Sequence, residues 1–279
     1  MATAVTEARQ PVPSQPEVRR RPAASGIFRE AGELIVFCGQ ALIAIPGALR
    51  YFSEALRQAG LMMRGALLLL FLMNVFLGFS IGNFAYFMLR GIGAGDFLGL
   101  VSAYNAPRQV GPTMFGYVFT AKVCCAMAAE LGAMRIQQEV DAYSSTGVDP
   151  RCYLVGTRLL AVLLFVPVAT AVTLVAHIAG VYTMSVVILQ ALPGETLMTV
   201  HWDLQSLGDQ VFCIFTILAI ALSTSLVACF YGLRTNGGPA AVGASVAKSL
   251  VVNLVLLHVV AVCFAIWVYG LDHKMPLGG

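Results

Sequence analysis

The sequence predicts an all-α membrane protein, with an amino-terminal interfacial amphipathic helix, five transmembrane helices and a short helix between the second and third spans. Of its 279 residues, 58% are apolar and 11% are charged, and the mean hydropathy is +0.81. Soluble domains carry about 25% charged residues, so this chain has too little polar surface for a soluble fold. Several apolar stretches also exceed the roughly 20 residues that cross a bilayer as a helix.

Residues 1–26 are expected to form a disordered cytoplasmic tail. They contain four prolines and no apolar run, and the apolar core of a signal peptide does not follow their arginine triplet, Arg19–Arg21. Basic residues beside a bilayer favour retention on the cytoplasmic side.

Residues 27–58 are expected to form a kinked interfacial helix, because an apolar stripe that includes Leu34, Phe37 and Ala41 is interrupted at Pro46. A cytoplasmic helix packed on a partner is the alternative. Within a membrane domain comprising residues 59–279, the five spans are expected at about 65–89, 109–129, 159–188, 211–233 and 249–271. Loops are expected at 90–108 and 195–209, and a glycine-rich turn at 234–243.

Polar and small residues inside the spans are candidates for helix packing or for a lipid path. Asn74, Gly78 and Gly82 recur every four residues, which gives one helix face where another helix can approach closely. Lys122 is the most conspicuous charge within a span, at a cost of about 2.5–3.5 kcal/mol at mid-bilayer. We expect it to pair with a carboxylate such as Glu130, and contact with an anionic lipid headgroup is the alternative.

The distribution of basic residues predicts the orientation. Segments 1–64, 130–158 and 234–248 hold thirteen of the seventeen lysines and arginines, whereas the segments on the opposite side hold three. The positive-inside rule therefore places the amino terminus and the connection between spans two and three in the cytoplasm, and the carboxyl terminus outside.

That cytoplasmic connection predicts a short amphipathic helix over residues 134–146. Ile136, Val140 and Tyr143 share one helical face, and Arg135 and Glu139 are spaced to pair on another face. Gly147 is expected to stop the helix, and Asp149-Pro150 to start the next one.

No catalytic constellation emerges from the sequence. Glu139 and Asp141 would point about 200° apart on a helix, and the P-loop motif and metal-ligand spacings of cysteine and histidine are absent from the sequence. His177 and His258 are single histidines on apolar helices, more typical of interior hydrogen bonding than of a proton relay. Nothing indicates nucleic-acid binding. A cytoplasmic helix between spans, without a nucleotide site, favours a transporter subunit driven by a separate ATPase.

Several motifs resemble those of MlaE/YrbE permeases, the membrane subunits of ABC lipid transporters. The resemblance rests on Ala129-Glu-Leu-Gly-Ala-Met-Arg135, Glu139-Val-Asp-Ala142, Gly147-Val148 and Tyr153-Leu-Val-x-x-Arg158. Two further motifs, Ile45-Pro-x-Ala-Leu-Arg50 and Phe230-Tyr-Gly232 with Gly237-Gly-Pro-x-x-Val-Gly243, are similar to the B-type YrbE subunit of actinobacterial Mce systems.

The resemblance implies a multi-pass plasma-membrane permease that imports lipid, expected to be fatty acid or sterol, and has no cofactor of its own. Its implied partners are an A-type YrbE subunit, an MceG/MlaF-like ATPase that binds ATP and Mg, and an Mce protein assembly outside. An intramembrane lipid-modifying enzyme using His177 or His258, or a non-transporting scaffold, would be the alternatives.

The resemblance also implies that the helix at 134–146 is the coupling helix, which docks on the ATPase. Glu139, Asp141 and Ala142 match the family motif, whereas Gln138 and the Ser144-Ser145-Thr146 run depart from it. Because these departures make the helix less acidic, docking is expected to rely more on packing by Ile136, Val140 and Tyr143. The expected coupling residues are Arg135, Ile136, Gln138, Glu139, Val140, Asp141, Ala142, Tyr143 and Gly147.

Overall fold

The computed structural model describes residues 23–270, so most of the tail expected over 1–26 and the carboxyl-terminal residues 271–279 lie outside the described residues. Between residues 23 and 270 every regular element is a helix. Five helical runs are long and apolar enough to cross a membrane, which confirms an all-α membrane protein with five spans. These runs are Phe28–Gly91, Gly95–Ile136, Arg151–Ile188, Leu207–Leu233 and Pro239–Tyr269.

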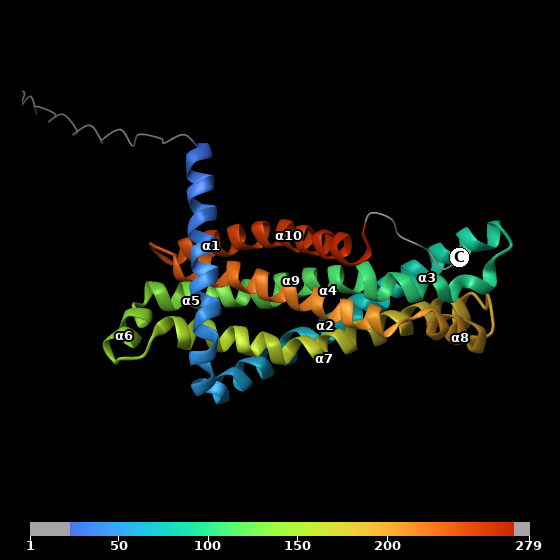
Figure 1. The fold of residues 1–279 in the computed structure, drawn as a ribbon, viewed down its shortest axis with the longest axis horizontal. Coiled ribbons are helices and arrows are strands. Elements are labelled where there is room, and N and C mark those ends of the chain that lie inside the picture. The colour runs from blue at the N-terminus through green and yellow to red at the C-terminus, as the bar shows by residue number, and fades with distance from the viewer. Residues whose placement is uncertain (1–22, 271–279) are drawn as a thin grey trace, which may run out of the picture.

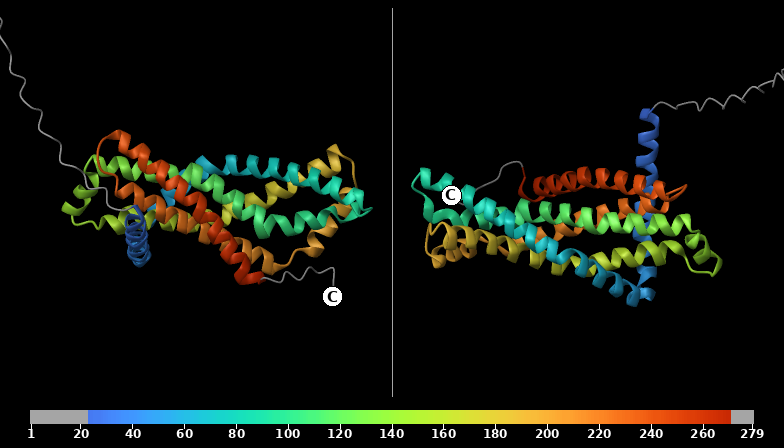
Figure 2. Two further views of the ribbon diagram at one scale, coloured as in Figure 1. Left: turned by 90° about the horizontal axis from the view of Figure 1, so that it is seen from above. Right: turned by 180° about the vertical axis from the view of Figure 1, so that it is seen from behind.

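The helices of the five runs form an elongated bundle (Figures 1 and 2). A short helix, α6 (Glu139–Ser145), lies at one end of the bundle, and α3 (Leu98–Asn105) and α8 (Gly194–Leu204) lie at the other. We call these the α6 end and the α8 end. The main helices of the spans are α2 (Phe52–Gly91), α4 (Gly111–Phe119), α5 (Cys125–Ile136), α7 (Thr157–Tyr182), α9 (Leu207–Leu233) and α10 (Pro239–Tyr269).

The first helix, α1 (Ala23–Ala48), runs across the bundle near the α6 end rather than along it (Figure 1). It contains Pro46 and is followed by a 3-10 turn, Leu49–Tyr51. The structure therefore places the break after the proline, and residues 52–58 belong to the long helix α2.

The loops expected at 90–108 and 195–209 are largely helical, and that expectation was wrong. Residues 98–105 form α3, and residues 194–204 form α8. These helices approach closely because Gly99 has no side chain, since a Cβ there would lie 2.6 Å from the carbonyl oxygen of Leu197. The close contact buries Leu98 and Leu197, which stabilises two helices too short to persist alone.

The longest contact in the bundle is the seam between α2 and α7. A Cβ on Gly78 would lie 2.9 Å from the Cα of Gly180, and one on Gly82 would lie 3.0 Å from Ser185 Oγ. Glycines at these positions let the two backbones touch. In lipid the hydrophobic effect does not drive helices together, so their association depends on close van der Waals packing of this kind. The seam therefore sets the distance between the first and third spans.

We expect Gly180→Ala to destabilise the bundle by about 1–3 kcal/mol, because the new methyl group would overlap the backbone of α2 at Val75 and Gly78. Thermal unfolding of the detergent-solubilised protein measures the effect. Gly60→Ala on α2 is the matched control, because a Cβ at Gly60 meets no atom within 4 Å. Equal melting temperatures for the two variants would contradict a tight seam.

Candidate functional site

The connection between the second and third spans is a sharp helical hairpin. Helix α5 ends at Ile136, and Gln138 adopts a left-handed conformation with φ of 61° that starts α6 in a new direction. Such a backbone conformation is uncommon for a residue with a side chain. The helix expected over 134–146 thus begins only at Glu139, and Arg135 and Ile136 belong to α5. Gly147, with φ of 80°, follows the end of α6 as expected.

An ion pair closes this hairpin. Arg135 Nη1 lies 2.7 Å from Asp141 Oδ1. The expected pair between Arg135 and Glu139 is not formed, because the break at Gln138 removes the spacing of a continuous helix. Glu139 is exposed and makes no ion pair with any residue between 23 and 270.

The apolar face of α6 packs on the permease itself. Val140 and Tyr143 contact a buried cluster that contains Leu131 and Leu154, and the Tyr143 ring lies 5.1 Å from the ring of Tyr153. Both side chains are partly buried by these contacts within the permease, and their role in docking stays a prediction. Glu139, Asp141 and Ala142 remain exposed and form the outer surface of α6.

An ion pair between a buried arginine and a half-exposed glutamate lies just behind the hairpin. Arg158 on α7 is only 2% exposed, and its Nη2 lies 2.9 Å from Glu130 Oε2 on α5. Its Nη1 also donates a hydrogen bond to the carbonyl oxygen of Leu154. The pair joins the helix that leads into α6 to the helix that follows it. Glu130 is thus paired with Arg158, and the expected pairing of Glu130 with Lys122 is not formed.

Helix α1 braces the same end of the bundle from outside. Near its end, Ala48 packs against Gly156, where a Cβ would lie 2.6 Å from the Ala48 Cβ. The Tyr51 ring lies 5.1 Å from the Tyr153 ring. The helix therefore contacts the segment that links α6 to α7.

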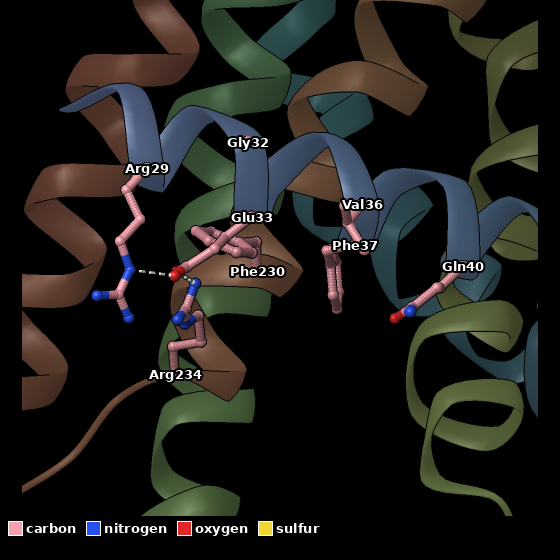
Figure 3. Close-up of a pocket in the computed structure, with 8 residues that line it drawn as sticks. All are labelled: Arg29, Gly32, Glu33, Val36, Phe37, Gln40, Phe230 and Arg234. Atoms are coloured by element: carbon pink, nitrogen blue, oxygen red, sulfur yellow. Dashed lines mark hydrogen bonds and ion pairs between the residues drawn. The ribbon is translucent and has the colours of Figure 1, made fainter. Parts of the chain in front are cut away.

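The other half of α1 is attached to the turn between α9 and α10. Figure 3 shows Glu33 between Arg29 and Arg234, and Glu33 Oε2 lies 2.5 Å from Arg234 Nη1. Glu30 pairs with Lys248 across the same contact, and the rings of Phe37 and Phe230 lie 5.6 Å apart. The two halves of α1 thus contact different spans, the later half the start of the third span and the earlier half the fourth and fifth spans.

The residues predicted inside the first span lie at the α2–α7 seam. Asn74, Gly78 and Gly82 are all buried on α2. The Asn74 amide donates to the carbonyl oxygen of Leu70 at 2.8 Å, within its own helix. Lys122 lies elsewhere, on an exposed face of the second span.

The two histidines of the spans occupy different surroundings. His177 is fully buried, and neither ring nitrogen has a hydrogen-bond partner. His258 lies on an exposed face, with its ring nitrogens 2.8 Å from Tyr117 Oη and 2.7 Å from the carbonyl oxygen of Leu254. Among residues 23–270, no group of three or more metal-ligating side chains is close enough to hold an ion.

A polar network that the sequence analysis missed joins three spans at the α8 end. Asp209 Oδ1 accepts hydrogen bonds from Arg108 Nε and Tyr269 Oη, both at 2.9 Å. The Arg108 guanidinium also lies over the rings of Tyr104 and Tyr269, at 4.1 and 4.6 Å. Ser206 and Asp209 form a capping box at the start of α9. The Ser-x-x-Asp spacing could have predicted that cap from the sequence.

His201 on α8 is 2% exposed, and its Nδ1 has no hydrogen-bond partner. Burial disfavours the charged imidazolium and lowers the pKa of His201 to about 4. The ring packs edge-on against Trp202 at 5.0 Å. The folded protein therefore favours the neutral form of the His201 imidazole.

We expect Glu130→Gln to lower the free energy of unfolding by about 1–3 kcal/mol, because it leaves the buried Arg158 guanidinium without its counter-charge. Arg135→Gln is the control, and it should change stability by about 0.5 kcal/mol or less, since the Arg135–Asp141 pair is exposed. Chemical denaturation in detergent measures both. A larger effect from Arg135→Gln would contradict the ranking.

The stability of the protein should fall as the pH is lowered from 6.5 towards 4. Between these values the unfolded chain binds a proton at His201, whose ordinary pKa is about 6.5, whereas the folded protein does not. The contribution of His201 at pH 5 is a loss of about 2 kcal/mol relative to pH 7.5. Melting temperatures at the two pH values should differ less for His201→Gln than for the wild type. His258→Gln should keep the wild-type difference.

Comparison with known proteins agrees with this architecture. The family model described as Permease MlaE matches residues 55–267. A probable ABC transporter permease protein of Synechocystis sp. is 30% identical over 60% of this chain and 63% of its own length. The chloroplastic protein TRIGALACTOSYLDIACYLGLYCEROL 1 of Arabidopsis thaliana is 28% identical over 59% of this chain and 47% of its own.

The intermembrane phospholipid transport system permease protein MlaE of Haemophilus influenzae is 26% identical over 55% of this chain and 59% of its own length. The chain therefore matches less than two thirds of the length of each of these three relatives. The family model, in contrast, covers most of the chain, from the start of α2 almost to the end of α10. The chain thus belongs to the MlaE permease family.

Proposed function

We propose that this chain is the membrane subunit of an ABC lipid transporter and that α6 docks on a separate cytoplasmic ATPase, which binds ATP and Mg. Membership of the permease family and the transport functions for which the relatives are named support a transport role. The observation that carries the docking site is the exposed outer surface of α6, Glu139, Asp141 and Ala142, on a helix whose other face is fixed to the permease.

The proposed orientation places the α6 end in the cytoplasm and the α8 end outside. It rests on the thirteen lysines and arginines of segments 1–64, 130–158 and 234–248. With this orientation α1 lies along the inner surface of the membrane, as its course across the bundle suggests (Figure 1). The protein would then be a plasma-membrane protein with its amino terminus inside and its carboxyl terminus outside.

In this mechanism the ATPase moves α6, and the permease transmits the movement. The Arg135–Asp141 pair connects α6 to α5, and the contact between Tyr143 and Tyr153 connects it to the start of the third span. The Glu130–Arg158 pair then keeps these two spans together. A push on α6 would thus tilt the second and third spans as one unit.

The finer proposal is that the chain is a B-type YrbE subunit of an Mce system, paired with an A-type subunit. An Mce assembly would receive or deliver lipid at the outer surface, and the cargo would be fatty acid or sterol moving inward. These assignments rest on the motifs at residues 45–50, 230–232 and 237–243.

The geometry favours transport over intramembrane catalysis. His177 is buried without a hydrogen-bond partner, and His258 is engaged by Tyr117 and Leu254 rather than by a nucleophile with a carboxylate. A scaffold role makes a different prediction, because a scaffold would not raise ATP hydrolysis when lipid is added. Lipid-stimulated ATP hydrolysis by the reconstituted complex separates the two.

We expect Glu139→Lys to abolish co-purification with the ATPase and lipid-stimulated ATP hydrolysis, while leaving the melting temperature of the permease unchanged. Glu139 suits this test because it is exposed and unpaired among residues 23–270, so its replacement breaks no contact within the fold. Asp141→Lys should have the same effect on docking, but it would also break the pair with Arg135.

The matched control is Glu195→Lys, an equal change of charge on the exposed first turn of α8 at the opposite end of the bundle. This control should retain the ATPase and its activity. Normal docking and lipid transport by Glu139→Lys would show that α6 is not the coupling element.

A further inference from the structure

Two basic side chains inside the first and second spans have no partner among residues 23–270. Arg64 on α2 and Lys122 in the second span are both exposed, and neither makes a hydrogen bond or an ion pair with any residue between 23 and 270. Some basic residues in this half of the bundle are paired, such as Arg57 with Glu54 and Arg158 with Glu130. Arg50 and Arg151 also have no side-chain partner among the described residues, but Arg50 lies in the 3-10 turn before α2 and Arg151 begins the third run, whereas Arg64 lies inside α2 and Lys122 inside the second run.

The two cations come together where the first and second spans touch. Lys122 Cε lies 3.7 Å from the position of a Cβ on Gly65, so the lysine stem passes over the glycine that follows Arg64. The sequence has no acidic residue between Glu54 and Asp96, nor between Asp96 and Glu130. The contact therefore places the Lys122 stem beside the residue that follows Arg64, on segments of the two spans that contain no carboxylate.

A local irregularity of the second span presents the lysine at the surface. Residues Thr120–Cys124 form a π-helical segment between α4 and α5. Such a segment adds a residue to the turn and is common at functional sites. Thr120, Val123 and Cys124 are buried here, whereas Lys122 is exposed. The helix thus deviates from regular geometry at the point where it presents a charge to the membrane.

An apolar strip continues from these charges along α2. Leu61, Leu68 and Leu72 are exposed, and with Arg64 and Gly65 they recur at the three- and four-residue spacing of a single helix face. A membrane-facing surface with two cations beside an apolar strip matches a molecule with an anionic head and an acyl chain. Unpaired charges are costly within a span, and binding such an anion would offset that cost.

We propose that Arg64 and Lys122 form a binding site for the phosphate of an anionic phospholipid, whose acyl chain lies along the exposed leucines of α2. The site faces the membrane directly and lies in the half of α2 nearer the α6 end (Figure 1). It requires only that α2 and the second span cross the membrane, so it stands apart from the proposed docking of α6.

Native mass spectrometry of the full-length protein, purified from nanodiscs of phosphatidylglycerol and phosphatidylcholine in equal amounts, tests the site. The wild type should retain phosphatidylglycerol in preference to phosphatidylcholine. The double variant Arg64→Gln/Lys122→Gln should bind phosphatidylglycerol about twentyfold more weakly, and each single variant about fivefold. The conservative variant Arg64→Lys/Lys122→Arg should retain it.

Arg90→Gln is the control, because it removes one exposed arginine from the far end of α2, where it contacts Tyr86. Unchanged retention of phosphatidylglycerol in the double and single glutamine variants would overturn the proposal. Displacement of the lipid by excess inorganic phosphate would also overturn it, by indicating a site for a free anion. Wild-type protein that retains no lipid, with cysteine cross-links from position 68 to a second protein chain, would assign the face to a protein partner instead.

Because no ATPase is present, this measurement does not depend on coupling. If Glu139→Lys loses ATPase docking but retains lipid normally, the two sites are independent. If the wild type docks on the ATPase normally but retains no phosphatidylglycerol, the lipid site is wrong and the docking proposal stands.

Discussion

The ion pair between Glu130 and Arg158 determines how the α6 end of the bundle is built. The Arg158 guanidinium has almost no contact with water, so its charge must be balanced by a carboxylate at short distance. This requirement holds the end of α5 and the start of α7 at a fixed separation. The hairpin that contains α6 spans that separation, and its position follows from the pair.

The hairpin is consequently a stiff element rather than a free amphipathic helix. Gln138 turns the chain in a left-handed conformation, Arg135 holds Asp141, and Tyr143 packs inward on Tyr153. Its outer surface, which includes Glu139 and Asp141, is exposed, whereas Val140 and Tyr143 are partly buried against the permease. A rigid hairpin would pass a displacement of α6 to the second and third spans, whereas a flexible one would deform instead. Helix α1 extends this stiffness, because it rests on the start of the third span and on the turn between α9 and α10.

The sequence predicted the spans well, because apolar length alone decides which segments can cross a bilayer. It did not predict α3 and α8, since their stability comes from the close approach at Gly99, a contact between residues about a hundred positions apart. Nor did it predict the Arg135–Asp141 pair, because nothing in the composition marks Gln138 as left-handed. The inward face of α6 was missed for a similar reason. Amphipathicity shows that a helix has an apolar face, but not whether that face contacts its own chain or another protein.

The two polar networks of the bundle share one feature, because each joins a buried charge to a partner that is more accessible to water. At the α8 end, Asp209 is 5% exposed and Arg108 about a quarter exposed, so separating the pair would leave a buried carboxylate uncompensated. At the α6 end, Arg158 is 2% exposed, and separation from Glu130 would leave its charge uncompensated. Between them, the α2–α7 seam joins backbones directly and leaves no room for one helix to rotate on the other. Both ends of the bundle therefore resist separation of their ion pairs, and the seam between them fixes the first and third spans against each other.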